Sequence, residues 1–157
     1  MAGDRKARVA IIMGSKSDKS AMENCKKYLN YFKIPFEEFI LSAHRAPDET
    51  AEFARAAEQN GYKVIIGAAG MAAHLAGALA AHTTLPVIGV PMPGSHLNGI
   101  DALYSTVQMP TGVPVATVAI GTAGAANAAV LAAQILALCD SALQDKLHEF
   151  KKKGCRI

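Results

Sequence analysis

Tryptophan is absent from this sequence, and its aromatic residues are four tyrosines and five phenylalanines. Proteins that bind single-stranded nucleic acid stack bases on aromatic side chains along a basic groove. Flavin carriers likewise place aromatic rings against their cofactor. Neither class fits so few aromatic residues, and we expect no nucleic-acid partner and no flavin.

Charged residues are also scarce, at 18% of the chain against 51% hydrophobic residues, and the formal net charge is only +3. The basic clusters lie at the two ends, in Arg5–Arg8 and Lys151–Arg156, where they favour solubility over nucleic-acid binding. The small polar fraction indicates subunit contacts, so we expect a homo-oligomer. The length suits one domain over residues 1–157, with its core at about 8–143 and a C-terminal helix to about 153.

Three cysteines, with no CxxC spacing, indicate neither disulfides nor a zinc site. The longest uncharged stretch, Ala102–Cys139, contains prolines, glycines and amide side chains, so it does not predict a membrane helix. The N-terminal "MAGDRKAR" lacks the apolar core of a signal peptide. We therefore expect a cytoplasmic protein without membrane association.

Short apolar runs alternate with helical patterns along the chain. Strands are predicted at 8–13, 36–41, 64–68, 86–90 and 113–120. Helices are predicted at 19–32, 47–60, 72–82, 98–109, 123–138 and 141–153. This alternation predicts an α/β fold, a three-layer α/β/α sandwich with a central parallel sheet in the order 2-1-3-4-5. Such sheets bind ligands at the carboxyl ends of their strands, so the loops after the first three strands are the candidates.

The helix predicted at 123–138 carries no charged residue, so no face of it suits water. The sheet and neighbouring helices of the same chain can cover such a helix. Its small residues also allow a helix of another subunit to approach closely. We favour the second arrangement and expect the oligomer to form there.

The first candidate loop is "MGSKSD", Met13–Asp18. Its glycine permits a tight turn, and the backbone amides that follow open a helix whose N-terminus favours an anion. Ser15 and Ser17 offer hydroxyl groups, and Asp18 can accept from sugar hydroxyls. The alternative is that Ser17 and Asp18 only cap the helix.

The second loop contains Ser42, His44 and Arg45 at the end of the second strand. Arginine suits bidentate binding of phosphate, and histidine exchanges protons near neutral pH. Taken alone, the pair is typical of ordinary surface. Its position at the ligand-binding edge of the predicted sheet favours function.

The third loop, Gly67–Gly77, has almost no side chains apart from Met71, His74 and Leu75. A planar ligand can lie against the backbone of such a loop. The alternative is close helix packing, with His74 a core histidine.

Taken together, "GSKSD", "SAHR", "AAHL", "DALYSTVQMPTGVPVATVAIG" and "AGAANAA" resemble the class I form of the AIR carboxylase family. The resemblance covers roughly Arg8 to Leu143, with the motifs in family order. It implies a single catalytic domain of flavodoxin-like fold, usually assembled as an octamer with its site near subunit junctions. It implies an isomerase of de novo purine (IMP) biosynthesis that moves a carboxyl group within a ribonucleotide, with no metal and no organic cofactor.

The resemblance also implies roles for the candidate residues. Ser15, Ser42 and Arg45 would bind the ribose phosphate, Asp18 would bind the ribose hydroxyls, and His44 would carry the proton. The base and its carboxyl group would lie against Ala69, Gly70, Met71, His74 and Leu75. Because carbon dioxide must stay beside the ring between its release and recapture, we expect a small and mostly dry pocket.

Four residues depart from the family pattern. The family usually reads "GAGGAAHLPG" where this chain has Ala68, Met71 and Ala76, and it has threonine where this chain has Ala46. Met71 is the departure of most consequence, because a long side chain can narrow the pocket.

Two further activities stay open. The class II form carboxylates aminoimidazole ribonucleotide directly with carbon dioxide; it typically has lysine after the motif histidine, so Arg45 favours class I. A non-catalytic sugar-phosphate sensor would bind the nucleotide without converting it. A signalling receiver domain is disfavoured, because it needs an acidic cluster after the first strand, where only Asp18 is present.

Overall fold

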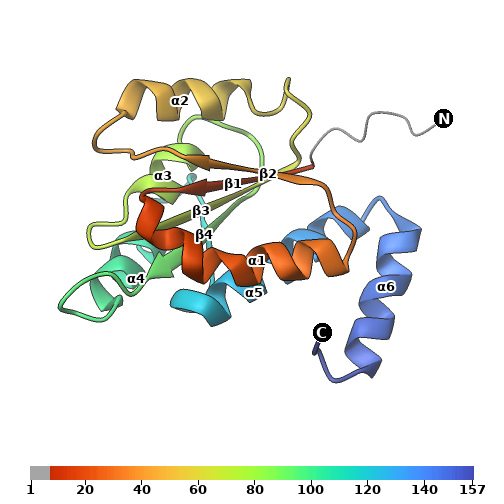
Figure 1. Cartoon of the computed structure of the whole chain (residues 1–157). Helices are drawn as coiled ribbons and strands as arrows, with labels where there is room; N and C mark the ends of the chain where they lie inside the picture. The colour runs from red at the N-terminus through yellow and green to blue at the C-terminus, as the bar shows by residue number, and fades with distance from the viewer. Residues whose placement is uncertain (1–7) are drawn as a thin grey trace.

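Five strands pair in parallel in the order β2-β1-β3-β4-β5, which confirms the predicted topology (Figure 1). The structure, a computed structural model, describes residues 8–157. The strands are β1 (Val9–Met13), β2 (Phe36–Ile40), β3 (Val64–Gly70), β4 (Val87–Met92) and β5 (Ala116–Thr117). The predictions made for "MAGDRKAR" concern residues that, apart from Arg8, lie outside this range.

Helices cover both faces of the sheet, which confirms the three-layer α/β/α, flavodoxin-like architecture (Figure 1). They are the 3₁₀ helix η1 (Lys16–Asp18) and the α-helices α1 (Lys19–Tyr31), α2 (Pro47–Ala56), α3 (Leu75–Ala80), α4 (Ile100–Val107), α5 (Gly121–Ala137) and α6 (Ser141–Lys152). On one face α1 and α5 lie side by side and α6 packs on α5; on the other, α2 packs on α3 and α3 packs on β3 and β4.

Each face of the sheet has its own apolar core. Alternate residues of β1 separate the two, because Val9 and Ile11 belong to the core under α1 and α5, whereas Ala10 and Ile12 belong to the core under α2 and α3. A strand buried on both faces needs a continuous apolar run, and β1 is buried along its whole length. The free Cys25 lies in the first core, where burial raises the pKa of its thiol to about 12.

Two predicted boundaries were wrong in ways that bear on the third loop. The third strand continues through Gly70, because it pairs with β4 as far as Gly70 and Met92. The following helix starts only at Leu75, because the chain turns at Met71, where φ is 56°. The prediction had placed Ala69 and Gly70 in a loop, and the structure places them at the end of β3.

The last strand is much shorter than the predicted range 113–120. Only two of its residues pair with β4, at Ile88 with Ala116 and Gly89 with Thr117. Pro114 has no N–H to donate, and an edge strand has a partner on one side only. The helix before it starts at Ile100 and not at residue 98, because Gly99 has a φ of 87°.

The uncharged helix α5 is covered mainly by its own chain. Its small residues face α1, α6 and the sheet, and the fully buried ones are Ala125, Ala128, Ala129, Ala132 and Ala133. Contacts within the chain therefore account for much of its apolar composition, and the expected approach of a neighbouring subunit stays a prediction. Within residues 8–157, no helix is both long enough and apolar enough to cross a bilayer.

Candidate active site

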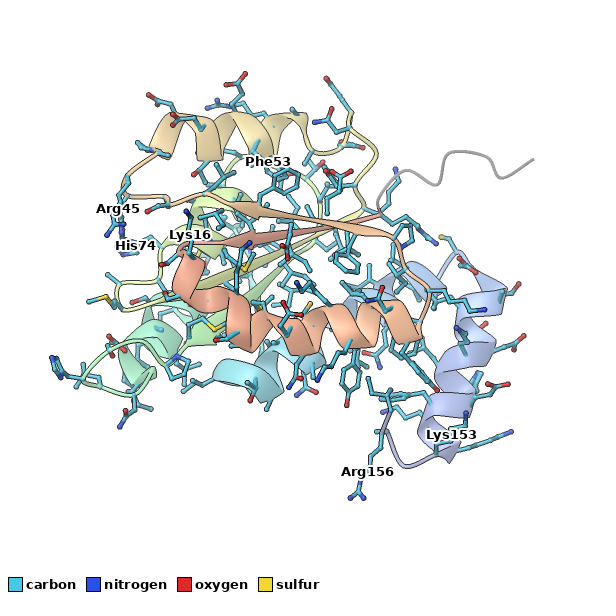
Figure 2. The ribbon with its side chains drawn as sticks, viewed as in Figure 1. Lys16, Arg45, Phe53, His74, Lys153 and Arg156 are labelled. Carbon is cyan, nitrogen blue, oxygen red and sulfur yellow. The ribbon has the colours of Figure 1, made fainter. Side chains whose placement is uncertain are left out.

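The loops after β1, β2 and β3 meet at the carboxyl edge of the sheet and line one cavity of about 400 Å³. Every candidate residue named from the sequence lines this cavity: Ser15, Asp18, Ser42, His44, Arg45, Ala69, Gly70, Met71, His74 and Leu75. Figure 2 shows Lys16, Arg45 and His74, one from each loop, at the same end of the molecule. The expectation that these loops converge is confirmed.

Sequence reasoning missed one side of the cavity, which Gly94 lines from the loop after β4. The signal was present in "MPGS", where a proline and a glycine follow directly on a buried strand. Because β4 is the neighbour of β3, its carboxyl end necessarily reaches the same edge.

In the first loop, Ser15 and Asp18 form a capping box. The Ser15 hydroxyl oxygen accepts from the Ser17 amide at 3.3 Å, and the Asp18 carboxylate accepts from the Ser15 amide at 3.0 Å. The capping alternative is therefore confirmed for Asp18 but wrong for Ser17, because Ser15 is the other capping residue. A carboxylate has several acceptor sites, so one cap bond leaves capacity for a ligand.

Asp18 is buried, with 9% of its surface exposed. Burial raises the pKa of its carboxyl group, and hydrogen bonds with the Ser15 amide and the Ser17 side chain oppose that rise. Ionisation of Asp18 is therefore less favourable in the folded chain than in the unfolded chain, and the ionised carboxylate lowers the stability of the fold.

In the second loop, the Ser42 hydroxyl and carbonyl oxygens both accept from the Arg45 amide, at 3.3 and 3.2 Å. The Ala46 amide donates to the Ser42 carbonyl at 2.8 Å. These bonds fix the turn and leave the Arg45 guanidinium exposed. Within residues 8–157, Arg45 takes part in no ion pair, so its charge is available to an anionic ligand.

A hydrogen bond joins the second loop to the third. His44 Nε2 lies 2.6 Å from His74 Nδ1, with ring centroids 4.8 Å apart and planes at 89°. One of the two nitrogens must donate and the other accept, so the pair fixes the orientation of both rings. Sequence reasoning named both histidines but did not predict this contact.

The third loop brings backbone close to backbone at Gly70. A Cβ atom there would lie 3.2 Å from the Met92 carbonyl oxygen, so a side chain at this position would crowd β4. Leu75 is only 2% exposed and forms part of the floor, whereas Met71 is 61% exposed. The three side chains His44, Arg45 and His74 are also exposed.

Because these three side chains are exposed, the cavity is open in the single chain. The small, mostly dry pocket that the sequence led us to expect stays a prediction. No group of three metal-binding side chains occurs among residues 8–157.

An open parallel α/β sheet with polar side chains at its carboxyl edge defines a flavodoxin-like protein with a cavity at the edge where such sheets bind ligands. Comparison with known proteins gives the family. Residues 8–156 match AIR carboxylase, and the chain belongs to this family.

Curated relatives share about half of their residues with this chain. It is 54% identical over 146 residues to N5-carboxyaminoimidazole ribonucleotide mutase of Haemophilus influenzae, covering 93% of this chain and 89% of that protein. The protein of the same name from Bacillus subtilis is 55% identical over 141 residues, which is 90% of this chain and 87% of that one. A crystal structure of PurE from Treponema denticola superimposes with a TM-score of 0.84 at 30% identity, covering 94% and 90% of the two chains.

Proposed function

We propose that this protein is an N5-carboxyaminoimidazole ribonucleotide mutase of de novo purine biosynthesis, which forms 4-carboxy-5-aminoimidazole ribonucleotide. One observation carries the proposal: a chain 54% identical to a mutase over 93% of its length gathers His44 and Arg45 in one pocket. The name of the relatives favours the class I reaction over direct carboxylation.

The cavity has separate places for the parts of such a substrate. Ser15, Ser42 and Arg45 supply hydroxyl and guanidinium donors for the phosphate. Asp18 accepts from the ribose hydroxyls. The ring then lies toward the third loop, against the backbone of Ala69 and Gly70, beside Met71, His74 and Leu75.

His44 serves as acid and then as base. It gives a proton to the exocyclic nitrogen as the bond from that nitrogen to the carboxyl carbon breaks, and carbon dioxide forms. Ring carbon 4 then gives its electron pair to the carbon of carbon dioxide, and the proton of carbon 4 returns to His44. Atoms and charge balance without a cofactor, and His74 orients the His44 ring throughout.

Supplying each substrate separately tests the proposal. The purified protein is expected to convert the carbamate without added bicarbonate, and to act on aminoimidazole ribonucleotide only when bicarbonate is abundant. Failure to convert the carbamate, together with conversion of aminoimidazole ribonucleotide when carbon dioxide is supplied, would show the direct carboxylase. Binding without turnover of either compound would show a sugar-phosphate sensor.

Arg45→Ala is expected to weaken nucleotide binding by about 10- to 100-fold, because it removes charge-assisted hydrogen bonds to the phosphate. Isothermal titration with the product nucleotide measures this. Arg55→Ala is the matched control, because Arg55 is an exposed arginine in the last turn of α2 and does not line the cavity. Equal affinities for Arg45→Ala and the parent would exclude the phosphate role.

Asp18→Asn is expected to separate stability from binding. The amide oxygen keeps the cap bond to Ser15, while the charge that burial disfavours is removed. Because the folded pKa of Asp18 lies above its unfolded value, the parent gains stability as the pH falls through the folded pKa. At pH 7 the variant should melt at the same or a higher temperature than the parent, and this difference should shrink as the pH falls toward 4.

The same variant is expected to bind nucleotide about tenfold more weakly or worse, since a neutral amide accepts less strongly from ribose hydroxyls than a carboxylate. Thermal melts at two pH values and a binding titration check both parts. A variant that melts lower at pH 7 and binds normally would limit Asp18 to its capping role.

We further propose a single catalytic domain that works in the cytoplasm as a homo-oligomer, with the octamer of the family as the expected size. The apolar surface that supports association lies on and beside α4. Leu97, Ile100, Tyr104 and Val107 are between 46% and 64% exposed, and the last three recur at helical spacing on one face. Light scattering on the purified protein measures the assembly, and a monomer at micromolar concentration would contradict it.

A further inference from the structure

Met71 has a backbone conformation that favours glycine. Its φ is 56°, in the left-handed region that L side chains rarely adopt. Three other non-glycine residues between 8 and 157 share this region: Lys33, Asn98 and Cys155. Of these four residues, only Met71 lines the cavity that contains His44.

Packing within the chain does not compensate for this conformation. The Met71 side chain is 61% exposed, although it is apolar and directly follows the half-buried end of β3. Unfavourable backbone geometry is concentrated at active sites, ligand clamps and switch regions, where the strain is part of the mechanism. A thioether is flexible, and it packs well against the edge of an aromatic ring.

The chemistry of the site indicates what covers Met71. If the phosphate lies at the first and second loops, the aromatic ring of the substrate lies at the third, where Met71 and His74 line the same cavity. The intermediate that must not escape is carbon dioxide. It is small and uncharged, so an apolar side chain retains it better than a hydrogen-bond donor does.

We infer that Met71 closes over the substrate ring and holds carbon dioxide beside ring carbon 4 between its release and its recapture. The inference rests on the proposed mutase function. Each released molecule of carbon dioxide either forms the new bond to carbon 4 or escapes, and escape leaves aminoimidazole ribonucleotide as the product. Met71 would determine the ratio of these two outcomes.

The test measures this partition in three proteins: the parent, Met71→Gly and Met71→Leu. Each receives the carbamate substrate with carbonic anhydrase and no added bicarbonate, and the rate of decarboxylation without enzyme is subtracted. In Met71→Gly, the ratio of aminoimidazole ribonucleotide to carboxylated product is expected to rise roughly two- to tenfold, because an apolar side chain no longer covers the ring. Met71→Leu keeps an apolar side chain and should stay near the parent.

Lys33→Gly is the matched control. Lys33 has a φ of 58°, so glycine relieves the same backbone geometry, but the residue lies before β2 at the opposite end of the sheet. Its product ratio should equal that of the parent. A rise in this control would overturn the inference, because relief of the backbone would then act without any contact to the substrate.

Two other results would overturn it as well. One is an unchanged product ratio in Met71→Gly, even with faster turnover, which would mean that the methionine only obstructs the site. The other is a change in assembly size, which would place Met71 in a subunit contact. A parent that does not convert the carbamate refutes the proposed function together with this inference, whereas an active parent with an unchanged ratio refutes the inference alone.

Discussion

His44→Asn is expected to lower the rate of carboxylate transfer by a factor of about 10² to 10⁴ while nucleotide affinity stays near the parental value. The reaction needs one proton given to nitrogen and one removed from carbon, and asparagine does neither near neutral pH. Asparagine is too short to reach the position of His44 Nε2, so the hydrogen bond with His74 Nδ1 is lost with the proton carrier. The proposed phosphate ligands Ser15, Ser42 and Arg45 are unchanged, which keeps nucleotide affinity near that of the parent. Turnover and product binding are measured on the same preparation.

A second variant tests whether the loss of activity is specific to His44 or follows from replacing any histidine. His148→Asn changes an exposed histidine of α6, a helix that packs against α5 and does not line the cavity. Its turnover should equal that of the parent. Near-parental turnover in His44→Asn would remove His44 from the chemistry and leave the mechanism without an acid.

The fold could be predicted from the sequence because its main signals are local. Runs such as Val9–Met13 are apolar without interruption, which is the pattern of a strand covered on both faces. Proline marks the start of α2 as predicted, whereas the helix ends at Ala56, before the predicted Asn60, and a turn continues to Gly61. Once the strands are parallel, right-handed crossovers allow few orders of the sheet.

The candidate residues could be predicted for the same reason. The carboxyl ends of neighbouring parallel strands lie at one edge of the sheet, so the loops that carry Ser15, Ser42 and His74 lie close together. In the structure the three residues line one cavity. Their roles toward a ligand are not fixed by this argument and stay predictions. What the topology guarantees is proximity.

Details that depend on one side chain or one torsion angle could not be predicted. The His44–His74 hydrogen bond joins residues 30 positions apart, and its length depends on two rotamers. The left-handed backbone conformation of Met71 could not be predicted, because methionine, unlike glycine or asparagine, is not typical of such a turn. The length of the last strand was overestimated because the β-branched residues around Pro114 are typical of a strand. In the structure only Ala116 and Thr117 pair with β4.

The small residues of α5 show how one signal supports two structures. Composition alone fits both a helix packed against another subunit and a helix packed closely within its own chain. The structure uses the alanines for the second purpose, against α1 and the sheet. The tightest approach is at Gly124, at the start of the helix, where the chain that leaves β5 passes directly beside it.

Gly124→Ala is expected to destabilise the protein by about 3 kcal/mol or more, which is a large fraction of the free energy of unfolding of a marginally stable domain. A Cβ atom at this position would lie 1.6 Å from the Ala119 carbonyl oxygen and 3.3 Å from a Val90 methyl group. Because the first of these neighbours is backbone, no change of rotamer relieves the clash. Helix propensity alone predicts the opposite sign, a gain of about 1 kcal/mol for alanine over glycine.

The two effects differ in sign, so urea unfolding of Gly124→Ala decides between them. Gly94→Ala is the control for stability, because a Cβ atom at Gly94 meets nothing within 4 Å and the backbone there is not left-handed. It should unfold at the parental midpoint. If Gly124→Ala is as stable as this control, α5 can shift away from Ala119, and its close packing is then not what holds the helix against β4.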